Sequence, residues 1–113
     1  MAKVQSIDRN TSADTAMEIL ERDGVVIYQH LLDDDVMDQV QSELDDYLAR
    51  AYNGEGEFWG FKTKRFGALV AKSRTFAEQC APNPQILAVM DQLLGPRCEC
   101  YQLHVTMLVH IGP

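Results

Sequence analysis

The sequence predicts an α+β fold in which helices pack on a few β-strands. Apolar residues recur at the helical period in several segments, and most of these segments begin with a residue that caps helices. Two other stretches have the β-branched or alternating pattern of strands. Because these elements do not repeat regularly as strand, helix, strand, the pattern favours α+β over α/β. With 113 residues, 46% of them hydrophobic, residues 1–113 are expected to form a single domain around one core.

The first third of the chain is predicted to contain a helix, a glycine turn and a strand. Thr11 or Ser12 is suited to cap the helix, and Gly24 stands where a left-handed residue ends it. Residues 25–28 form a short β-branched run that is typical of a buried strand. Asp33 is expected to cap a second, longer helix, which has one apolar stripe and one charged face.

The remaining elements are a loop, two helices and a strand. Residues 52–64 combine turn residues with clustered aromatics and show no sustained period, which predicts a long loop. A short helix is predicted over residues 73–80, with Ser73 as its cap. Another is predicted over residues 83–94, which opens with Asn-Pro and ends before Gly-Pro. Apolar and mixed residues alternate over 98–111, so this stretch is predicted to be one long strand with an apolar face and a mixed face.

The composition argues against several classes of partner. A net charge of -7 opposes binding to nucleic acids and anionic membranes, whose phosphates repel an acidic protein. No apolar run approaches the roughly 20 residues that span a bilayer, and the N-terminus lacks the apolar core of a signal peptide. We therefore expect a cytoplasmic protein with a small-molecule or protein partner. Its three cysteines, Cys80, Cys98 and Cys100, are expected to be reduced thiols.

One basic segment stands out in this acidic chain. No acidic residue occurs between Phe58 and Ala77, and this segment holds half of the basic residues of the chain. They are Lys62, Lys64, Arg65, Lys72 and Arg74. The local positive field is suited to receive a small anion. The alternative is a solvated loop that balances the acidic helix, since surface charges are usually of that kind.

Five blocks of sequence, taken in order, carry a resemblance to a known family. They are residues 19–27, the helix of residues 33–48, Arg65 ahead of residues 71–73, residues 86–96, and residues 101–113. In this order they resemble the front half of the phytanoyl-CoA dioxygenase family of Fe(II)/2-oxoglutarate-dependent oxygenases. The resemblance covers the chain from about Ala13 onward. It implies the N-terminal part of a double-stranded β-helix, a jelly-roll or cupin-like fold.

The resemblance also implies a reaction and its cofactors. Members of the family hydroxylate an unactivated C–H bond of a small-molecule substrate and decarboxylate 2-oxoglutarate to succinate. Their iron is held by two histidines and one carboxylate, and the His-x-Asp part of this set follows the strand that ends here at Pro113. We therefore expect no catalytic or metal-binding residue within this chain. Alone, it is expected to bind neither Fe(II) nor 2-oxoglutarate as a cofactor and to be inactive.

Five residues are candidates for contact with small molecules, and two of them, Arg65 and Met107, match positions of the family that contact 2-oxoglutarate. The resemblance implies that Arg65 and Met107 lie near 2-oxoglutarate, and a planar guanidinium suits a dicarboxylate. The alternatives are a surface or structural ion pair for Arg65 and core packing for Met107. Trp59 is expected either in a substrate-facing lid or as an anchor of its loop. His104 and Thr106, on the mixed strand face, are expected to face either the substrate or solvent.

Two other interpretations compete with the oxygenase. A metal site of Cys98, Cys100, His104 and His110 is disfavoured, because an extended strand puts the first and last of these roughly 40 Å apart. The second hypothesis is a non-catalytic α+β module for binding or assembly. A β-helix strand without its neighbours exposes a free edge and an apolar face, so such a chain is expected to form a homodimer or a higher oligomer.

Overall fold

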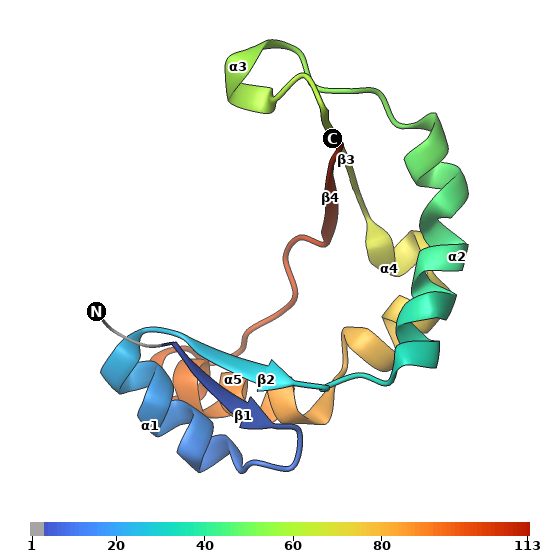
Figure 1. Cartoon of the computed structure of the whole chain (residues 1–113). Coiled ribbons are helices and arrows are strands. Elements are labelled where there is room, and N and C mark those ends of the chain that lie inside the picture. Colours follow the sequence, from blue (N-terminus) through green and yellow to red (C-terminus); the bar gives the residue numbers. More distant parts are fainter. Residues whose placement is uncertain (1–3) are drawn as a thin grey trace. The chain divides into compact units, whose positions relative to one another are not determined.

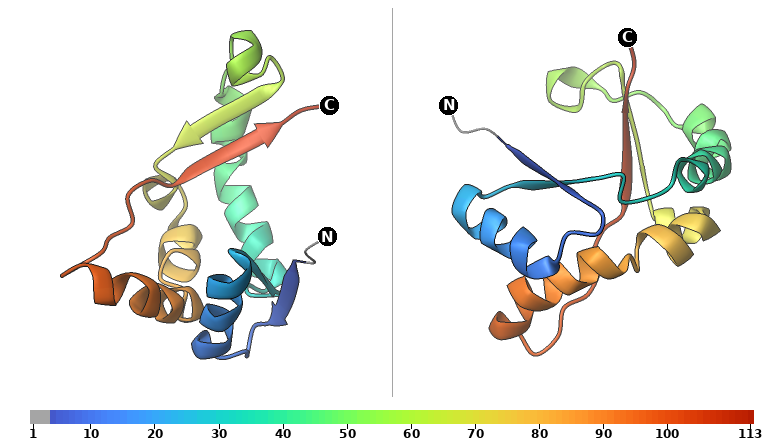
Figure 2. Two further views of the ribbon diagram at one scale, coloured as in Figure 1. Left: turned by 90° about the vertical axis from the view of Figure 1, so that its left-hand side faces the viewer. Right: turned by 60° about the horizontal axis from the view of Figure 1, so that its bottom comes forward.

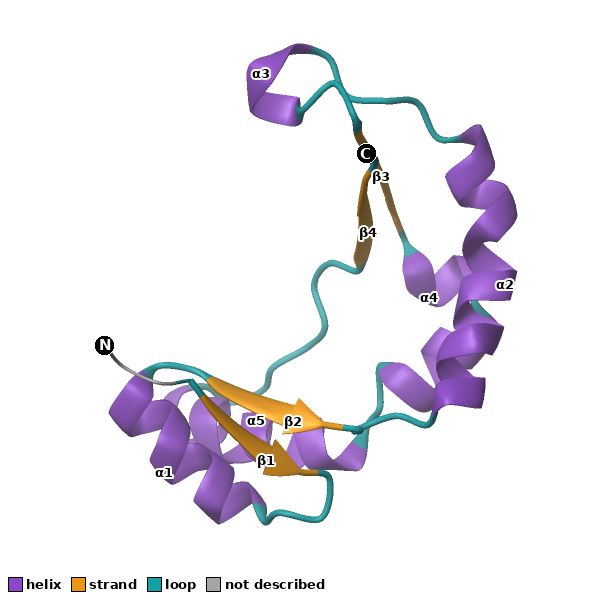
Figure 3. Cartoon of the chain, in the orientation of Figure 1, coloured by secondary structure: helices purple, strands orange, loops and turns teal. Residues whose placement is uncertain are grey.

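The computed structural model describes residues 4–113, which form two compact units (Figure 1). The first unit comprises residues 4–33 and Pro82–Gln102, and the second comprises Asp34–Ala81 and Leu103–Pro113. Figure 3 shows that both units combine helices with strands, as the α+β class predicts. Within residues 4–113 the strands form two two-stranded sheets and no closed barrel, so the double-stranded β-helix stays a prediction. The single domain over residues 1–113 also stays a prediction.

The first unit packs two helices against a parallel pair of strands. Its elements are β1 (Gln5–Asp8), α1 (Ala13–Asp23), β2 (Val26–Gln29), α5 (Pro84–Leu94) and the 3-10 turn η2 (Gly95–Arg97). β1 runs parallel to β2, with Gln5 opposite Val26. Ala16 and Met17 of α1 meet Val89 of α5 in the core. The sheet and the two helices therefore share one small apolar interior.

Capping residues fix the helix ends of this unit as the sequence predicts. The Ser12 side chain accepts a hydrogen bond from the Thr15 amide and caps α1. Gly24 has a φ of 75°, and its amide donates to the Leu20 carbonyl, which ends the helix in a left-handed turn. The Asn83 side chain accepts from two amides in the first turn of α5. These caps depend on neighbouring residues alone, which is why the sequence reveals them.

The strands of this unit depart from the sequence prediction in two ways. β2 forms close to the predicted residues 25–28, but it is half-buried rather than buried, and Ile27 is 47% exposed. A two-stranded sheet covered on one side leaves alternate residues open. β1 was not predicted, because Gln5–Asp8 contains a single β-branched apolar residue, Ile7. It becomes a strand through its pairing with β2.

The second unit packs a long helix and shorter helical turns on an antiparallel pair of strands. Its elements are α2 (Asp34–Arg50), α3 (Gly56–Trp59), β3 (Thr63–Gly67), α4 (Leu69–Lys72), the π-helical turn η1 (Phe76–Cys80) and β4 (Met107–Ile111). Figure 2 shows β3 and β4 side by side, with Thr63 opposite Ile111 and Gly67 opposite Met107. Val40 and Leu44 of α2 form the core with Leu69, and Leu108 packs against them.

Two predicted elements of the second unit are wrong in extent. The predicted loop of residues 52–64 contains the helical turn α3, and β3 begins at Thr63 within it. Of the predicted strand of residues 98–111, only Met107–Ile111 forms a paired strand. The alternation continues before residue 107, but β3 offers five residues to pair with. A strand is held only where its backbone finds a hydrogen-bonding partner.

The two faces of β4 have unequal environments. Leu108, on the face predicted to be mixed, packs toward the core under α2. Met107, Val109 and Ile111, on the apolar face, are 51%, 51% and 74% exposed. β3 is also bridged to Asn53 on its other side, so within the described residues β4 is the outer strand of this sheet. The apolar side of the β3–β4 sheet is therefore open in this chain.

None of the helices in residues 4–113 combines the length and the apolar character that a bilayer crossing requires. The cytoplasmic location stays a prediction.

Candidate functional site

Three of the predicted site residues meet on the open side of the β3–β4 sheet. They line a depression of about 370 Å³, which we call the Arg65 depression. Its lining consists of Tyr52, Gly54, Trp59, Thr63, Arg65, Phe66, Gly67 and Met107. Arg65 and Gly67 are two residues apart on β3 and therefore lie on the same face of the sheet. Met107 lies opposite Gly67 on β4. The antiparallel register thus brings Arg65 and Met107 to one surface, although they are far apart in the sequence.

Arg65 is held by the segment that carries Trp59. Its Nη1 atom donates a hydrogen bond to the Trp59 carbonyl at 2.5 Å, and its guanidinium carbon lies 5.5 Å from the centre of the indole ring. Within residues 4–113 no carboxylate forms an ion pair with Arg65, so neither the surface nor the structural ion pair of the alternative interpretation is found there. A fixed guanidinium with donors to spare is suited to bind an anion.

Two glycines let the aromatic segment fold back onto β3. A Cβ atom at Gly54 would lie 2.8 Å from the carbonyl oxygens of Trp59 and Gly60, which is too close for any side chain. Gly60 has a φ of 78°, and a Cβ there would meet the Thr63 hydroxyl at 2.6 Å. The amide of Gly54 donates to the Thr63 carbonyl at 2.8 Å. This close approach sets Trp59 over Arg65.

The aromatic side chains beside the depression are exposed. Trp59 is 55% exposed, and its ring meets the Phe58 ring edge-on at a centroid distance of 5.3 Å. Tyr52, Phe58 and Phe61 are 93%, 87% and 65% exposed. Trp59 therefore does not anchor its loop in the core; it rests on Arg65 at the edge of the depression. Its part in a substrate-facing lid stays a prediction.

His104 and Thr106 do not line this depression. The Thr106 hydroxyl accepts a hydrogen bond from the Leu69 amide at 2.9 Å, at the start of α4. His104 is exposed in the irregular segment before β4. The structure thus brings together Trp59, Arg65 and Met107 but neither of these two residues. Contact of His104 or Thr106 with a substrate stays a prediction.

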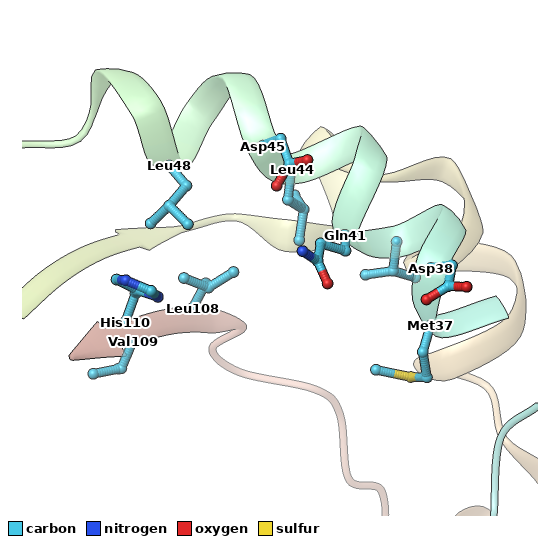
Figure 4. A pocket seen from close by; sticks show the side chains of 10 residues that line it. Met37, Asp38, Gln41, Leu44, Asp45, Leu48, Leu108, Val109 and His110 are labelled. Atoms are coloured by element: carbon cyan, nitrogen blue, oxygen red, sulfur yellow. The ribbon is translucent and has the colours of Figure 1, made fainter. Parts of the chain in front are cut away.

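A second cavity lies between α2 and β4, on the opposite side of the sheet, and we call it the α2–β4 groove (Figure 4). Its volume is about 400 Å³. Its lining consists of Met37, Asp38, Val40, Gln41, Leu44, Asp45, Leu48, Leu108, Val109 and His110. Figure 4 shows Leu44 and Leu48 pointing from α2 toward β4, with Leu108 pointing back. The sequence prediction missed this groove, because it joins elements some sixty residues apart.

A hydrogen-bonded carboxylate joins α2 to the segment after α4. Glu43 accepts hydrogen bonds from the Ser73 hydroxyl at 2.5 Å, the Thr75 hydroxyl at 2.8 Å and the Thr75 amide at 3.1 Å. The Ser73 hydroxyl also accepts from the Phe76 amide, which confirms Ser73 as a helix cap. These hydrogen bonds, that of Ser73 foremost, lower the pKa of Glu43 from 4.5 to about 2. Nothing in the sequence pattern distinguishes Glu43 from its acidic neighbours.

The described residues do not fit a metal centre. Within residues 4–113 no three histidine, cysteine, aspartate or glutamate side chains gather as a metal ion requires. A non-haem iron oxygenase centre needs two histidines and a carboxylate on one side of the iron. The chemistry of the side chains around Arg65 instead fits an organic anion that has an apolar part, because it combines a guanidinium, an indole and a thioether.

Comparison with known proteins finds relatives that are named dioxygenases. No family model matches the chain. It is similar to dioxygenase andF of Emericella variicolor, with 28% identity over 92% of this chain and 38% of that protein. It is 26% identical to dioxygenase aneA of Aspergillus aculeatus over 97% of this chain and 39% of that protein. Dioxygenase swnH2 of Arthroderma benhamiae is 30% identical over 83% of this chain and 31% of that protein.

The chain is thus a relative of fungal proteins named dioxygenases, and it spans about two-fifths of their length or less.

Proposed function

We propose that this chain is the N-terminal part of a phytanoyl-CoA dioxygenase-like, Fe(II)/2-oxoglutarate-dependent oxygenase that hydroxylates an unactivated C–H bond of a small molecule. The observation that carries this proposal is the similarity to proteins named dioxygenases along most of the chain. The ordered blocks that resemble the phytanoyl-CoA dioxygenase family support the narrower assignment. The share of the relatives' length that the chain spans agrees with a partial oxygenase domain.

The proposal assigns Arg65 and Met107 to the binding of 2-oxoglutarate. The Arg65 guanidinium would hold one carboxylate of the cosubstrate, and Met107 would contact its carbon chain. Trp59 keeps the guanidinium in place through its carbonyl and its ring, so Arg65 reaches the anion already oriented. Bound beside iron, 2-oxoglutarate would be decarboxylated to succinate and would supply the electrons with which the metal activates dioxygen, the oxidant of the reaction. In this proposal the iron ligands lie outside the 113 residues.

The test compares this chain with the protein obtained by reading its coding sequence on past Pro113. We expect a His-x-Asp motif shortly after that point. With Fe(II) and ascorbate, we expect the longer protein to release succinate from 2-oxoglutarate and the 113-residue chain to release none. A stop codon directly after Pro113, or turnover by the 113-residue chain, would contradict the proposal.

The second candidate function is a binding or assembly module that dimerises through β4. The observation in its favour is the outer position of β4 together with the exposure of Met107, Val109 and Ile111. β4 contains no lysine, proline or acidic residue, the devices that normally protect a strand edge. Two copies of β4 paired antiparallel about Val109 would extend the sheet across both chains.

Val109→Lys is expected to convert such a dimer into a monomer. It places two ammonium groups opposite each other at the centre of the strand pair, where like charges repel. Sedimentation at several concentrations measures the change. Val70→Lys is the matched control, because Val70 is an exposed valine on α4 and is 46% exposed. A parent chain that stays monomeric at micromolar concentration, or a dimer that Val109→Lys leaves intact, would rule out this candidate.

A further inference from the structure

We propose that the α2–β4 groove binds a small hydrophobic cation, with the chemistry of an alkylammonium ion. This inference is independent of the proposed oxygenase, because it uses the opposite side of the β3–β4 sheet. It rests on three features of the groove: its apolar interior, its unpaired carboxylates and the acidic surroundings of α2.

The interior of the groove suits an aliphatic chain. Leu44 and Leu48 of α2 face Leu108 of β4 across it (Figure 4). Its volume of about 400 Å³ lies within the range of small-molecule sites. An alkyl chain that enters removes its own surface and that of the leucines from water, so affinity is expected to rise with chain length.

The rim of the groove suits a positive charge. Asp38 and Asp45 line it, and within residues 4–113 neither side chain has an ion-pair or hydrogen-bond partner. Lys64 reaches the same helix, but its ammonium group donates to the Leu48 carbonyl at 3.2 Å. The two carboxylates are therefore available to a cation from outside.

Two further side chains at the groove can accept hydrogen bonds. Gln41 offers an amide oxygen from α2, and His110 on β4 offers a ring nitrogen in its neutral form. Within the described residues neither side chain has a hydrogen-bond partner, whereas the nearby Glu43 carboxylate is held by Ser73 and Thr75. An ammonium group has three N–H donors, so one that pairs with a carboxylate of the groove can also donate to a neutral acceptor of this kind.

The wider field of α2 has the same sign as the rim. The helix carries acidic residues along its length: Asp34, Asp35, Asp38, Glu43, Asp45 and Asp46. Arg50, in the last turn, is its single basic residue. A negative potential of this kind attracts cations and repels anions of the same shape. Charge therefore decides among ligands that fill the apolar interior equally well.

The test titrates the 113-residue chain with n-octylammonium, 1-octanol and octanoate, which share one alkyl chain and differ in charge. Methyl resonances of Leu44, Leu48 and Leu108 report binding by NMR. Each exposed ion pair favours binding by up to about fivefold, so we expect the ammonium to bind on the order of tenfold more tightly than octanoate. Butylammonium is expected to bind more weakly than octylammonium. High salt should reduce the preference for the cation, because it screens exposed charges.

The double substitution Asp38→Asn with Asp45→Asn is expected to remove most of the preference for the ammonium. The matched control is Asp34→Asn with Asp46→Asn, which changes the net charge of α2 equally but lies outside the groove lining. All four positions are exposed, so neither variant disturbs the core. Equal binding of the three octyl compounds, no saturable binding, or equal losses in both double variants would overturn the proposal.

Discussion

Replacing Glu43 with alanine is expected to destabilise the second unit strongly. The Ser73 side chain is fully buried and Thr75 is 9% exposed, and both hydroxyls donate to this carboxylate. A buried donor that loses its acceptor lowers the free energy of unfolding. Glu43→Ala should therefore destabilise the unit more than the loss of an ordinary surface contact does. Urea unfolding followed by circular dichroism measures the effect. Glu21→Ala is the control, because Glu21 is exposed on α1, and it should change the unfolding midpoint little.

The Glu43 carboxylate also makes the folding stability of the chain depend on pH. The pKa of Glu43 is lowered from 4.5 to about 2 in the folded chain. The contribution of the ionised Glu43 carboxylate to folding stability is therefore complete above about pH 4.5 and is lost as the pH falls toward 2. The difference in stability between the parent chain and Glu43→Gln should narrow over this window, because glutamine does not titrate. A difference that stays constant from neutral pH down to about pH 2 would contradict this assignment.

Ser73→Ala probes the network from the other side. It removes a donor to Glu43 and the side-chain cap of the Phe76 amide. Loss of the cap alone is expected to cost about 1 kcal/mol. The losses of stability caused by Ser73→Ala and Glu43→Ala should not add in the double variant, since both substitutions remove the same hydrogen bond.

The second large effect is expected at Arg65, in the longer oxygenase that we propose. Arg65→Ala should raise the KM for 2-oxoglutarate by about 10- to 100-fold, because a charged hydrogen bond to the carboxylate is lost. Arg65→Lys should restore part of the affinity, since it keeps the charge but not the planar fork.

The matched control for Arg65 is Arg74→Ala. Arg74 belongs to the same basic segment, but its side chain is 85% exposed and pairs with Glu78 at 2.7 Å. Steady-state rates at varied 2-oxoglutarate concentration give the KM of each variant, which we expect to rise in Arg65→Ala and to stay unchanged in Arg74→Ala. An unchanged KM in Arg65→Ala, or an equal rise in Arg74→Ala, would contradict the assignment of Arg65.

The helix ends could be predicted from the sequence because their causes are local. Ser12, Ser73 and Asn83 each accept hydrogen bonds from amides two or three residues ahead, and Gly24 supplies the left-handed turn. The length of β4 could not be predicted in this way. Alternation runs through residues 98–111, but pairing with the five residues of β3 decides where the strand begins.

The candidate site was predictable only in part. Strand alternation puts Met107 on the apolar face of β4, and the resemblance to a family singles out Arg65. Their meeting depends on the antiparallel register of two strands that the sequence does not pair. The close approach of Gly54 to Trp59 and Gly60 lies within one aromatic segment that has no sustained period, and the hydrogen bond of Glu43 to Ser73 joins residues 30 positions apart. Such contacts leave no periodic signal in the sequence.

The central claim is that the iron ligands of the proposed oxygenase lie outside these 113 residues. Anaerobic incubation of the purified chain with Fe(II), followed by desalting and metal analysis, tests it most directly. We expect no iron to remain with the protein, because within residues 4–113 no three suitable donors lie together. Retention of one equivalent of Fe(II) would contradict the claim.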